Sequence, residues 1–113
     1  MKKIQLSVLV MLGIIALAGC ITISDKADIN IKNSNEANTN IKSVFIKKTS
    51  SKEWGSDKLA SSEIKPNASK KFQVNKCTKK HDVKVVYLDE TTKYKRNLNL
   101  KCEKTVTFVF SDN

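Results

Sequence analysis

From Ala27 to Phe110, apolar and polar residues alternate with a period of two in one short segment after another. The alternation is clearest in ADINIKN (27–33), DVKVVYL (82–88) and TVTFVF (105–110), and polar turns recur about every ten residues. A period of two places apolar side chains on one face of a strand. After Cys20 no sustained helical stripe appears. The pattern therefore predicts an all-β domain, a small antiparallel β-sandwich.

Three further segments are expected to be strands: 41–49, 70–75 and 94–102. In the last of them, Leu98, Leu100 and Cys102 would share one face. The stretch between the first two has no period of two. We expect a long loop there, with Trp54 in it and a turn at Pro66, because proline fixes φ and cannot donate to a strand ladder.

The N-terminus has a different character. Lys2 and Lys3 precede an apolar run that starts at Ile4, and small residues close the run before Cys20. This order of regions is typical of a secretory signal peptide. A membrane span needs about 20 apolar residues, and this run reaches that length only with three polar residues included. We therefore expect a leader helix that is removed.

Leu17-Ala18-Gly19-Cys20 resembles the lipobox of bacterial lipoproteins, and all four positions match. The resemblance implies that Cys20 receives a diacylglycerol and becomes the first residue of the mature chain. Several acyl chains hold a protein stably at a membrane surface, whereas one holds weakly. Ile21 is not the aspartate that favours the inner membrane in enteric bacteria, so the resemblance favours an outer-membrane location. The alternatives are an ordinary signal peptide with a chance cysteine and a retained anchor helix.

This interpretation divides the chain into a lipoprotein signal peptide (1–19), a tether (20–27) and a single domain (28–113). The whole chain carries a net charge of +10, and about +8 remains after Lys2 and Lys3 leave with the leader. Arg96 is the only arginine. A lysine-rich surface is either simply solvated or attracted to anionic lipid headgroups and glycans. Nucleic acid is not expected as a partner, because the chain is expected to be exported, lacks arginine clusters and shows no aromatic residues interleaved with the basic ones in a stacking pattern along the sequence.

Cys77 and Cys102 remain once Cys20 is assigned to the lipid. Paired cysteines in an exported domain are expected to form a disulfide, here a structural one that links positions brought together by a hairpin. The alternatives are two free thiols or a metal site with His81. Metal is disfavoured because two cysteines and one histidine lack a fourth ligand and zinc spacing. We expect no metal and no cofactor.

Few residues point to specific chemistry. His81 is the only histidine, and we expect it to be exposed at a strand edge. Its neighbour Asp82 would point to the opposite face, so a catalytic pair is not expected and the chain is predicted not to be an enzyme. Trp54 is the candidate partner contact. The competing interpretation, which we favour, is that its ring closes one end of the sandwich core.

The mature chain is also similar to a loosely defined group of small exported bacterial β-domains. The similarity spans most of the stretch from Asp28 to Val106 and implies export and a β-fold without an activity. One position departs from the pattern, because Glu90 stands where a glycine usually follows the aspartate. The matching residues are Asn30, Asn33, Thr49 to Ser51, Trp54-Gly55, Asp57, Leu59, Pro66, Cys77, Asp82-Val83 and Cys102.

We therefore expect a lipid-anchored envelope protein with a binding or scaffolding role, contacting the membrane through Cys20 and envelope proteins or anionic headgroups through its surface. A second expectation is a small inhibitor of the periplasmic lysozyme-inhibitor type. An acidic surface shared by Asp82, Asp89, Glu90 and Glu103 would support the inhibitor, and dispersal of these residues among lysines would count against it.

Overall fold

The computed structural model describes residues 24–113, so the expected leader and Cys20 lie outside the described residues. No helix in residues 24–113 is long and apolar enough to cross a membrane. The described chain contains six strands: β1 (Ala27–Asn33), β2 (Ile41–Lys48), β3 (Ser69–Val74), β4 (His81–Tyr87), β5 (Thr92–Leu98) and β6 (Thr105–Phe110).

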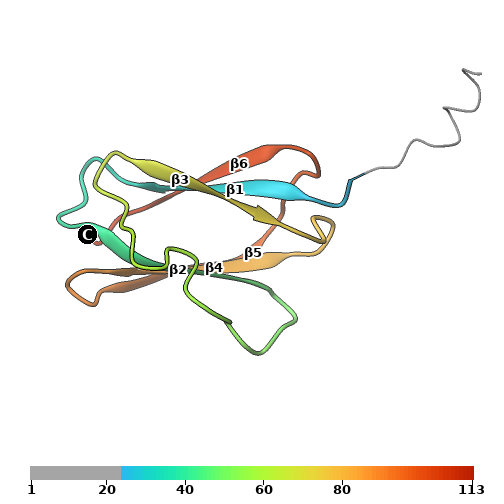
Figure 1. The fold of residues 1–113 in the computed structure, drawn as a ribbon, viewed down its shortest axis with the longest axis horizontal. Helices are drawn as coiled ribbons and strands as arrows, with labels where there is room; N and C mark the ends of the chain where they lie inside the picture. Colours follow the sequence, from blue (N-terminus) through green and yellow to red (C-terminus); the bar gives the residue numbers. More distant parts are fainter. Residues whose placement is uncertain (1–23) are drawn as a thin grey trace, which may run out of the picture.

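The strands form two three-stranded sheets that face each other, one in the order β3-β1-β6 and the other in the order β2-β4-β5 (Figure 1). The predicted all-β sandwich is confirmed. One pairing differs from the antiparallel prediction, because β1 is antiparallel to β3 but parallel to β6. The chain returns to the first sheet from β5 through a turn at the end where β1 also begins, so both strands run in the same direction.

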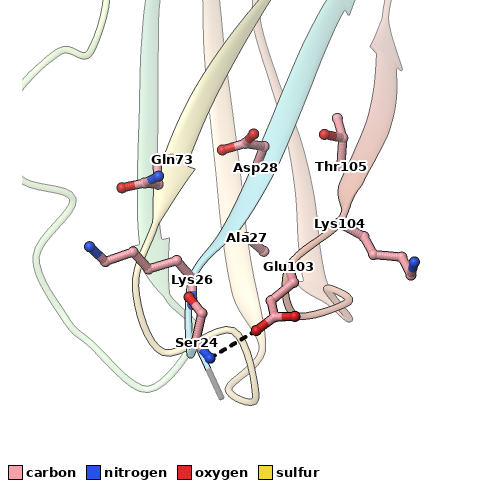
Figure 2. A pocket seen from close by; sticks show the side chains of 8 residues that line it. All are labelled: Ser24, Lys26, Ala27, Asp28, Gln73, Glu103, Lys104 and Thr105. Carbon is pink, nitrogen blue, oxygen red and sulfur yellow. Dashed lines mark hydrogen bonds between the residues drawn. The ribbon is translucent and has the colours of Figure 1, made fainter. Parts of the chain in front are cut away.

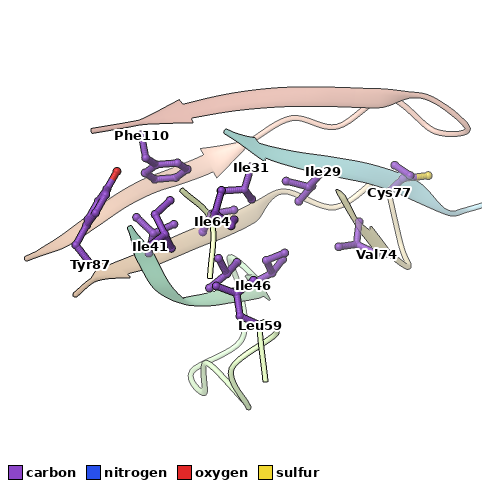
Figure 3. Packing of buried hydrophobic residues seen from close by; sticks show 14 residues of the cluster. Ile29, Ile31, Ile41, Ile46, Leu59, Ile64, Val74, Cys77, Tyr87 and Phe110 are labelled. Carbon is purple, nitrogen blue, oxygen red and sulfur yellow. The ribbon is translucent and has the colours of Figure 1, made fainter. Parts of the chain in front are cut away.

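The core lies between the sheets and follows the period of two (Figure 3). Ile29 and Ile31 of β1 are fully buried, as are Val83 and Val85 of β4. These residues lie on the two central strands, where both neighbours shield them. Full burial of one such side chain stabilises the fold by about 1.5–3 kcal/mol. The alternation therefore identified the central strands correctly.

The segment expected as a strand over 94–102 is shorter in the structure. β5 ends at Leu98, and 99–104 form a turn. Asn97 has a φ of 56°, a left-handed conformation, and lies at an irregularity in the pairing of β4 with β5, after which Leu98 still pairs with His81. The N–H of Asn97 donates to the side-chain Oδ1 of Asp82 on β4 at 2.9 Å instead of to a backbone carbonyl. The prediction that Leu98, Leu100 and Cys102 share one strand face was wrong, because the strand ends at Leu98, although all three side chains pack partly buried against the core.

The long loop between β2 and β3 covers the free edge of β2. Ile64 pairs with Ile41 in an isolated antiparallel bridge, and the Lys58 N–H donates to the Val44 carbonyl at 2.7 Å. Asp57 Oδ1 accepts the Val44 N–H at 2.9 Å. The loop also contributes Leu59 to the core, where it is 3 % exposed. An uncovered edge strand invites pairing with another chain, and this loop blocks that edge.

Cys77 and Cys102 form the predicted disulfide, with 5.3 Å between their Cα atoms. They do not lie opposite each other in a hairpin. The bond joins the turn between β3 and β4 to the turn between β5 and β6, and both turns lie at the same end of the sandwich. We call this end of the sandwich the disulfide end; it consists of 24–26, 75–80 and 99–104.

The first described residues are attached to the disulfide end by hydrogen bonds. The Cys77 N–H donates to the Asp25 carbonyl at 2.8 Å, and the Glu103 N–H donates to the Lys26 carbonyl at 2.7 Å. The Ser24 N–H donates to Glu103 Oε2 at 2.9 Å (Figure 2). Part of the segment expected as a tether is thus bound to the domain.

The opposite end is held by a buried polar network. We call this end of the sandwich the distal end; it consists of 34–40, 62–68, 88–91 and 111–113. The Tyr87 hydroxyl donates to Asn33 Oδ1 at 3.0 Å, and Asn33 Nδ2 donates to the carbonyls of Thr39 and Ile64 at 3.0 Å each. Tyr87 and Asn33 are both fully buried. One amide thus connects β1, β4 and two loops.

Candidate functional site

Trp54 lies against the outer face of the β2-β4-β5 sheet, away from the core. The prediction that its ring closes the end of the sandwich was wrong. Gly55, with a φ of 78°, follows it in a conformation that favours glycine. The ring is half-buried and its centroid lies 6.1 Å from that of Tyr94.

The strand register builds a mixed aromatic and basic surface under this ring. Lys84 on β4 stands between Phe45 on β2 and Tyr94 on β5, and Asp82 stands opposite Lys47 in the next row along β2. We call this surface the Trp54 face. Its members are Phe45, Lys47, Trp54, Lys84, Tyr94 and Arg96.

Cations of the Trp54 face lie over its rings. Lys84 Nζ is 4.5 Å from the Phe45 centroid and 5.0 Å from the Trp54 centroid. The Arg96 guanidinium is 4.5 Å from the Tyr94 centroid. Each contact of this kind stabilises a structure by about 0.5–1 kcal/mol at an exposed site. Tyr94 is nevertheless 48 % exposed, so the face offers an accessible ring beside an arginine.

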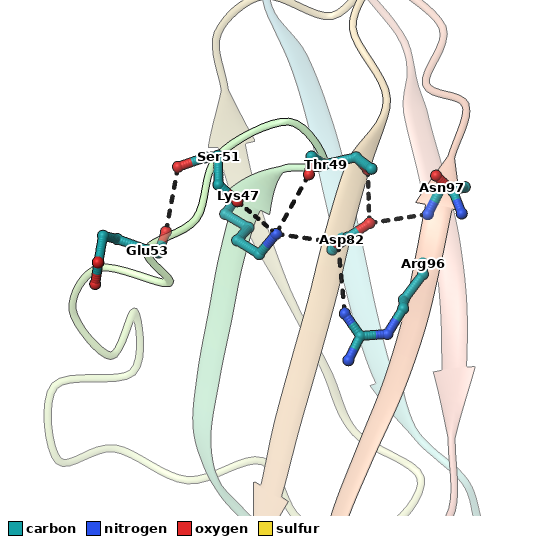
Figure 4. Close-up of polar contacts among 7 residues, drawn as sticks. All are labelled: Lys47, Thr49, Ser51, Glu53, Asp82, Arg96 and Asn97. Atoms are coloured by element: carbon teal, nitrogen blue, oxygen red, sulfur yellow. Dashed lines mark hydrogen bonds and ion pairs between the residues drawn. The ribbon is translucent and has the colours of Figure 1, made fainter.

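Asp82 holds the base of the Trp54 face together (Figure 4). Its carboxylate accepts from the Thr49 hydroxyl at 2.6 Å and pairs with Lys47 Nζ at 3.2 Å and Arg96 Nη1 at 3.6 Å. Burial alone would raise its pKa, but the hydrogen bonds from Thr49, Asn97 and Lys47 outweigh burial and keep the pKa below 3.8. Asp82 is therefore a structural anion that fixes the strands.

His81 is buried, with 3 % exposed, so the prediction that it lies exposed at a strand edge was wrong. Its Nδ1–H donates to the Lys79 carbonyl at 2.9 Å, within its own turn. The short turn between β3 and β4 folds the ring inward instead of leaving it at the rim. His81 therefore helps to shape that turn, while the Asp82 carboxylate is bound to Thr49, Lys47 and Arg96.

The four carboxylates that bear on the inhibitor hypothesis do not share a surface. Asp82 is buried in the β2-β4-β5 sheet. Asp89 and Glu90 lie in the turn between β4 and β5 at the distal end, and Glu103 lies at the disulfide end. This arrangement gives the inhibitor hypothesis no support.

The turns at the two ends carry opposite charge. The turns of the disulfide end contain six exposed lysines and two carboxylates, Asp25 and Glu103. The distal turns contain five carboxylates, and Lys65 is the only lysine in them. The six lysines are Lys26, Lys76, Lys79, Lys80, Lys101 and Lys104, and the five carboxylates are those of Glu36, Glu63, Asp89, Glu90 and Asp112.

Two shallow hollows open at the disulfide end. The first has a volume of about 210 Å³ and lies where β1, β3 and β6 meet the first described residues, with Ser24, Asp28 and Glu103 in its wall (Figure 2). The second has a volume of about 380 Å³ and lies between β2 and β3. Its lining contains no carboxylate and includes Lys47, Lys48, Lys58, Lys76 and His81.

Within residues 24–113, no group of three histidine, cysteine or acidic side chains is arranged to hold a metal ion. Comparison of the chain with protein-family models, with curated proteins and with solved structures finds no match.

Sequence reasoning identified Trp54 but not its neighbours. Phe45 and Tyr94 are more than 45 residues apart in sequence, and only the register of β2, β4 and β5 brings them to one face. The alternation does show that Phe45, Lys84 and Tyr94 oppose the core. Pairing the three strands in the correct order would have placed them together.

Proposed function

We propose that this chain is a lipid-anchored protein of the bacterial envelope and that its β-sandwich is a binding or scaffolding domain without catalytic activity. The observation that carries the proposal is the lipobox Leu17 to Cys20, placed four residues before a disulfide-bonded domain. The disulfide supports export, because such bonds persist in oxidising compartments. We place the anchored protein at the outer membrane.

The surface best suited to an envelope partner is the Trp54 face. Tryptophan, tyrosine and arginine are the residues most enriched where protein interfaces derive their affinity, and Tyr94 and Arg96 lie exposed side by side there. Asp82 fixes the backbone beneath them, so little freedom would be lost on binding.

The anchor is tested by labelling cells with an alkyne-bearing palmitate analogue. We expect label on the wild type and on Cys102→Ser, and none on Cys20→Ser, because only Cys20 follows the lipobox. The Cys102→Ser control also removes one cysteine, so loss of any cysteine cannot account for the result. Label on Cys20→Ser, or absence of label on the wild type, would contradict the anchor.

The partner surface is tested with a photo-crosslinking amino acid at Tyr94 and, as a matched control, at Val109. Both positions are 48 % exposed, and they belong to different sheets. We expect a discrete crosslinked product in cells from Tyr94 and not from Val109. Equal products from both positions, or products from Val109 alone, would show that the Trp54 face is not the contact.

A further inference from the structure

We propose that the disulfide end is a headgroup-binding surface that rests on the phosphates of anionic phospholipids, in the leaflet that holds the lipid anchor. The orientation rests on the proposed anchor at Cys20. The attraction itself does not, because it arises from side chains of the described domain.

The disulfide end carries an excess of positive charge. Its six lysines are exposed, and none of them forms an ion pair within residues 24–113. The lysines outnumber the nearby carboxylates, which are Asp25, Glu103 and, at the start of β1, Asp28, and Glu103 already accepts the Ser24 N–H. Lysine near an anionic bilayer contributes about 1 kcal/mol to binding for each residue. The disulfide end is thus a polybasic surface held on two crosslinked turns.

The opposing negative charge lies at the other end of the sandwich. The strands are six to eight residues long, which at about 3.3 Å per residue separates the two ends by roughly 20–25 Å. Salt screens charges beyond about 8–10 Å. The acidic distal end is therefore too far away to repel a bilayer that touches the lysines, and the charge gradient favours one orientation.

The hollow between β2 and β3 opens at this same end. Lys48 and Lys76 lie on opposite sides of it, and no carboxylate lines it. A lipid phosphate that entered the hollow would lie beside Lys48, Lys58 and Lys76, none of which forms an ion pair within residues 24–113. We infer that the hollow is the deepest point of contact with a headgroup.

The short chain length between Cys20 and the domain also favours this orientation. Cys20 lies four residues before Ser24, which is part of the disulfide end. Four residues span at most about 14 Å. An acylated Cys20 would hold this end, and not the acidic end, next to the headgroups.

The test uses the mature chain with Cys20→Ser, which contains every strand, the core and the disulfide. Its binding is measured by cosedimentation with vesicles of phosphatidylcholine alone and of phosphatidylcholine mixed with phosphatidylglycerol. We expect binding only to the mixed vesicles, and loss of that binding at high salt. Binding to both vesicles alike, or to neither at low salt, would overturn the proposal.

Two triple variants of equal charge locate the surface. The first variant removes three exposed lysines from the disulfide end: Lys79→Gln/Lys80→Gln/Lys104→Gln. The second variant removes three exposed lysines at or near the distal end and on the β3-β1-β6 face: Lys65→Gln/Lys70→Gln/Lys71→Gln. We expect the first to lower the partition coefficient by roughly 100-fold and the second to change it only a few-fold. Equal losses of vesicle binding in the two variants would contradict a binding surface confined to the disulfide end. Circular dichroism checks that both variants are folded.

A titration with soluble glycerol phosphate separates a lipid surface from a site for free phosphate compounds. We expect no saturable binding of glycerol phosphate to the domain. If the domain binds glycerol phosphate saturably and does not bind vesicles, the proposal is overturned. Failure of the anchor appears as missing label on Cys20 with vesicle binding intact. Failure of the surface appears as labelled Cys20 with no binding of the unacylated domain, so the two outcomes are distinguishable.

Discussion

The two ends of the sandwich are held together by different chemistry. At the disulfide end, a covalent bond joins two turns that are rich in lysine. At the distal end, the Asn33 amide and the Tyr87 hydroxyl join a strand end to the loops by hydrogen bonds, and the surrounding turns are acidic.

The difference follows from what each end can bury. The distal end closes over fully buried Tyr87 and Ile41, so its polar groups are satisfied in a protected interior, where an unpaired partner is costly. The disulfide end is formed by exposed polar turns with few apolar residues. Only Cys77 is deeply buried in those turns. The disulfide therefore provides the stabilisation that the packing of apolar side chains provides at the distal end.

The largest expected effect comes from removing the disulfide with Cys77→Ala/Cys102→Ala. The bond closes a loop with a sequence separation of 25, for which chain entropy predicts a loss of about 3–3.5 kcal/mol in the free energy of unfolding. Urea denaturation measures it. A loss below about 1 kcal/mol would show that the disulfide end is held by packing after all.

Asp82→Asn is expected to cost about 2 kcal/mol near neutral pH, because the buried carboxylate loses its charge opposite Lys47 and one acceptor becomes a donor. The pKa of Asp82 is depressed in the folded state, so its stabilisation is present above the unfolded value of 3.8 and disappears as pH falls through the folded pKa.

The measurement for Asp82→Asn is urea unfolding of both proteins from pH 7 to pH 2. The gap between wild type and variant should narrow below pH 3.8. A gap that stays constant across this window would mean that the carboxylate charge contributes nothing to the fold.

Tyr87→Phe tests the distal network and is expected to cost about 1–2 kcal/mol, because Asn33 Oδ1 is left buried without a donor. Burial, followed by Asp112 and Asp89, raises the pKa of the Tyr87 hydroxyl, which therefore remains a donor at neutral pH. Tyr94→Phe is the matched control, since that hydroxyl belongs to an exposed ring, and it should be nearly neutral. Equal effects in thermal melts would refute the distinction.

The smallest effect is a gain. Glu90 has a φ of 73°, a left-handed conformation that costs a side-chain-bearing residue roughly 1 kcal/mol. Glu90→Gly should stabilise the domain by about 0.5 kcal/mol after the exposed ion pair with Lys42 is lost. Glu90→Ala keeps the strain and loses the ion pair, so it should give no gain. If alanine stabilises as much as glycine, backbone strain at Glu90 is not the cause.

The sequence predicted features that depend on local pattern. Alternation located the core strands through Ile29, Ile31, Val83 and Val85, and the parity of the cysteines predicted the disulfide. The similarity to the exported β-domains also identified Glu90 as a departure, at a position where glycine is usual. The positive φ of Glu90 explains why glycine is favoured there.

Features that depend on long-range pairing were not predictable in the same way. The parallel pairing of β1 with β6 and the closure of the loop onto β2 arise from contacts between distant segments. Asn33 was identified only as the end of an alternating segment and as a residue that matches the group of exported β-domains, because no local signal shows that its amide will meet Tyr87. The charge separation of the two ends likewise appears only when the turns are assigned to their ends.

The most direct test of the account is amine-reactive footprinting of the acylated full-length protein in phosphatidylglycerol-containing vesicles, read by mass spectrometry. We expect an acyl mass on Cys20 and slower modification of Lys79, Lys80 and Lys104 than in detergent, with Lys65, Lys70 and Lys71 unchanged. Equal reactivity of the two sets, or protection of the second set, would contradict a domain that rests on its disulfide end.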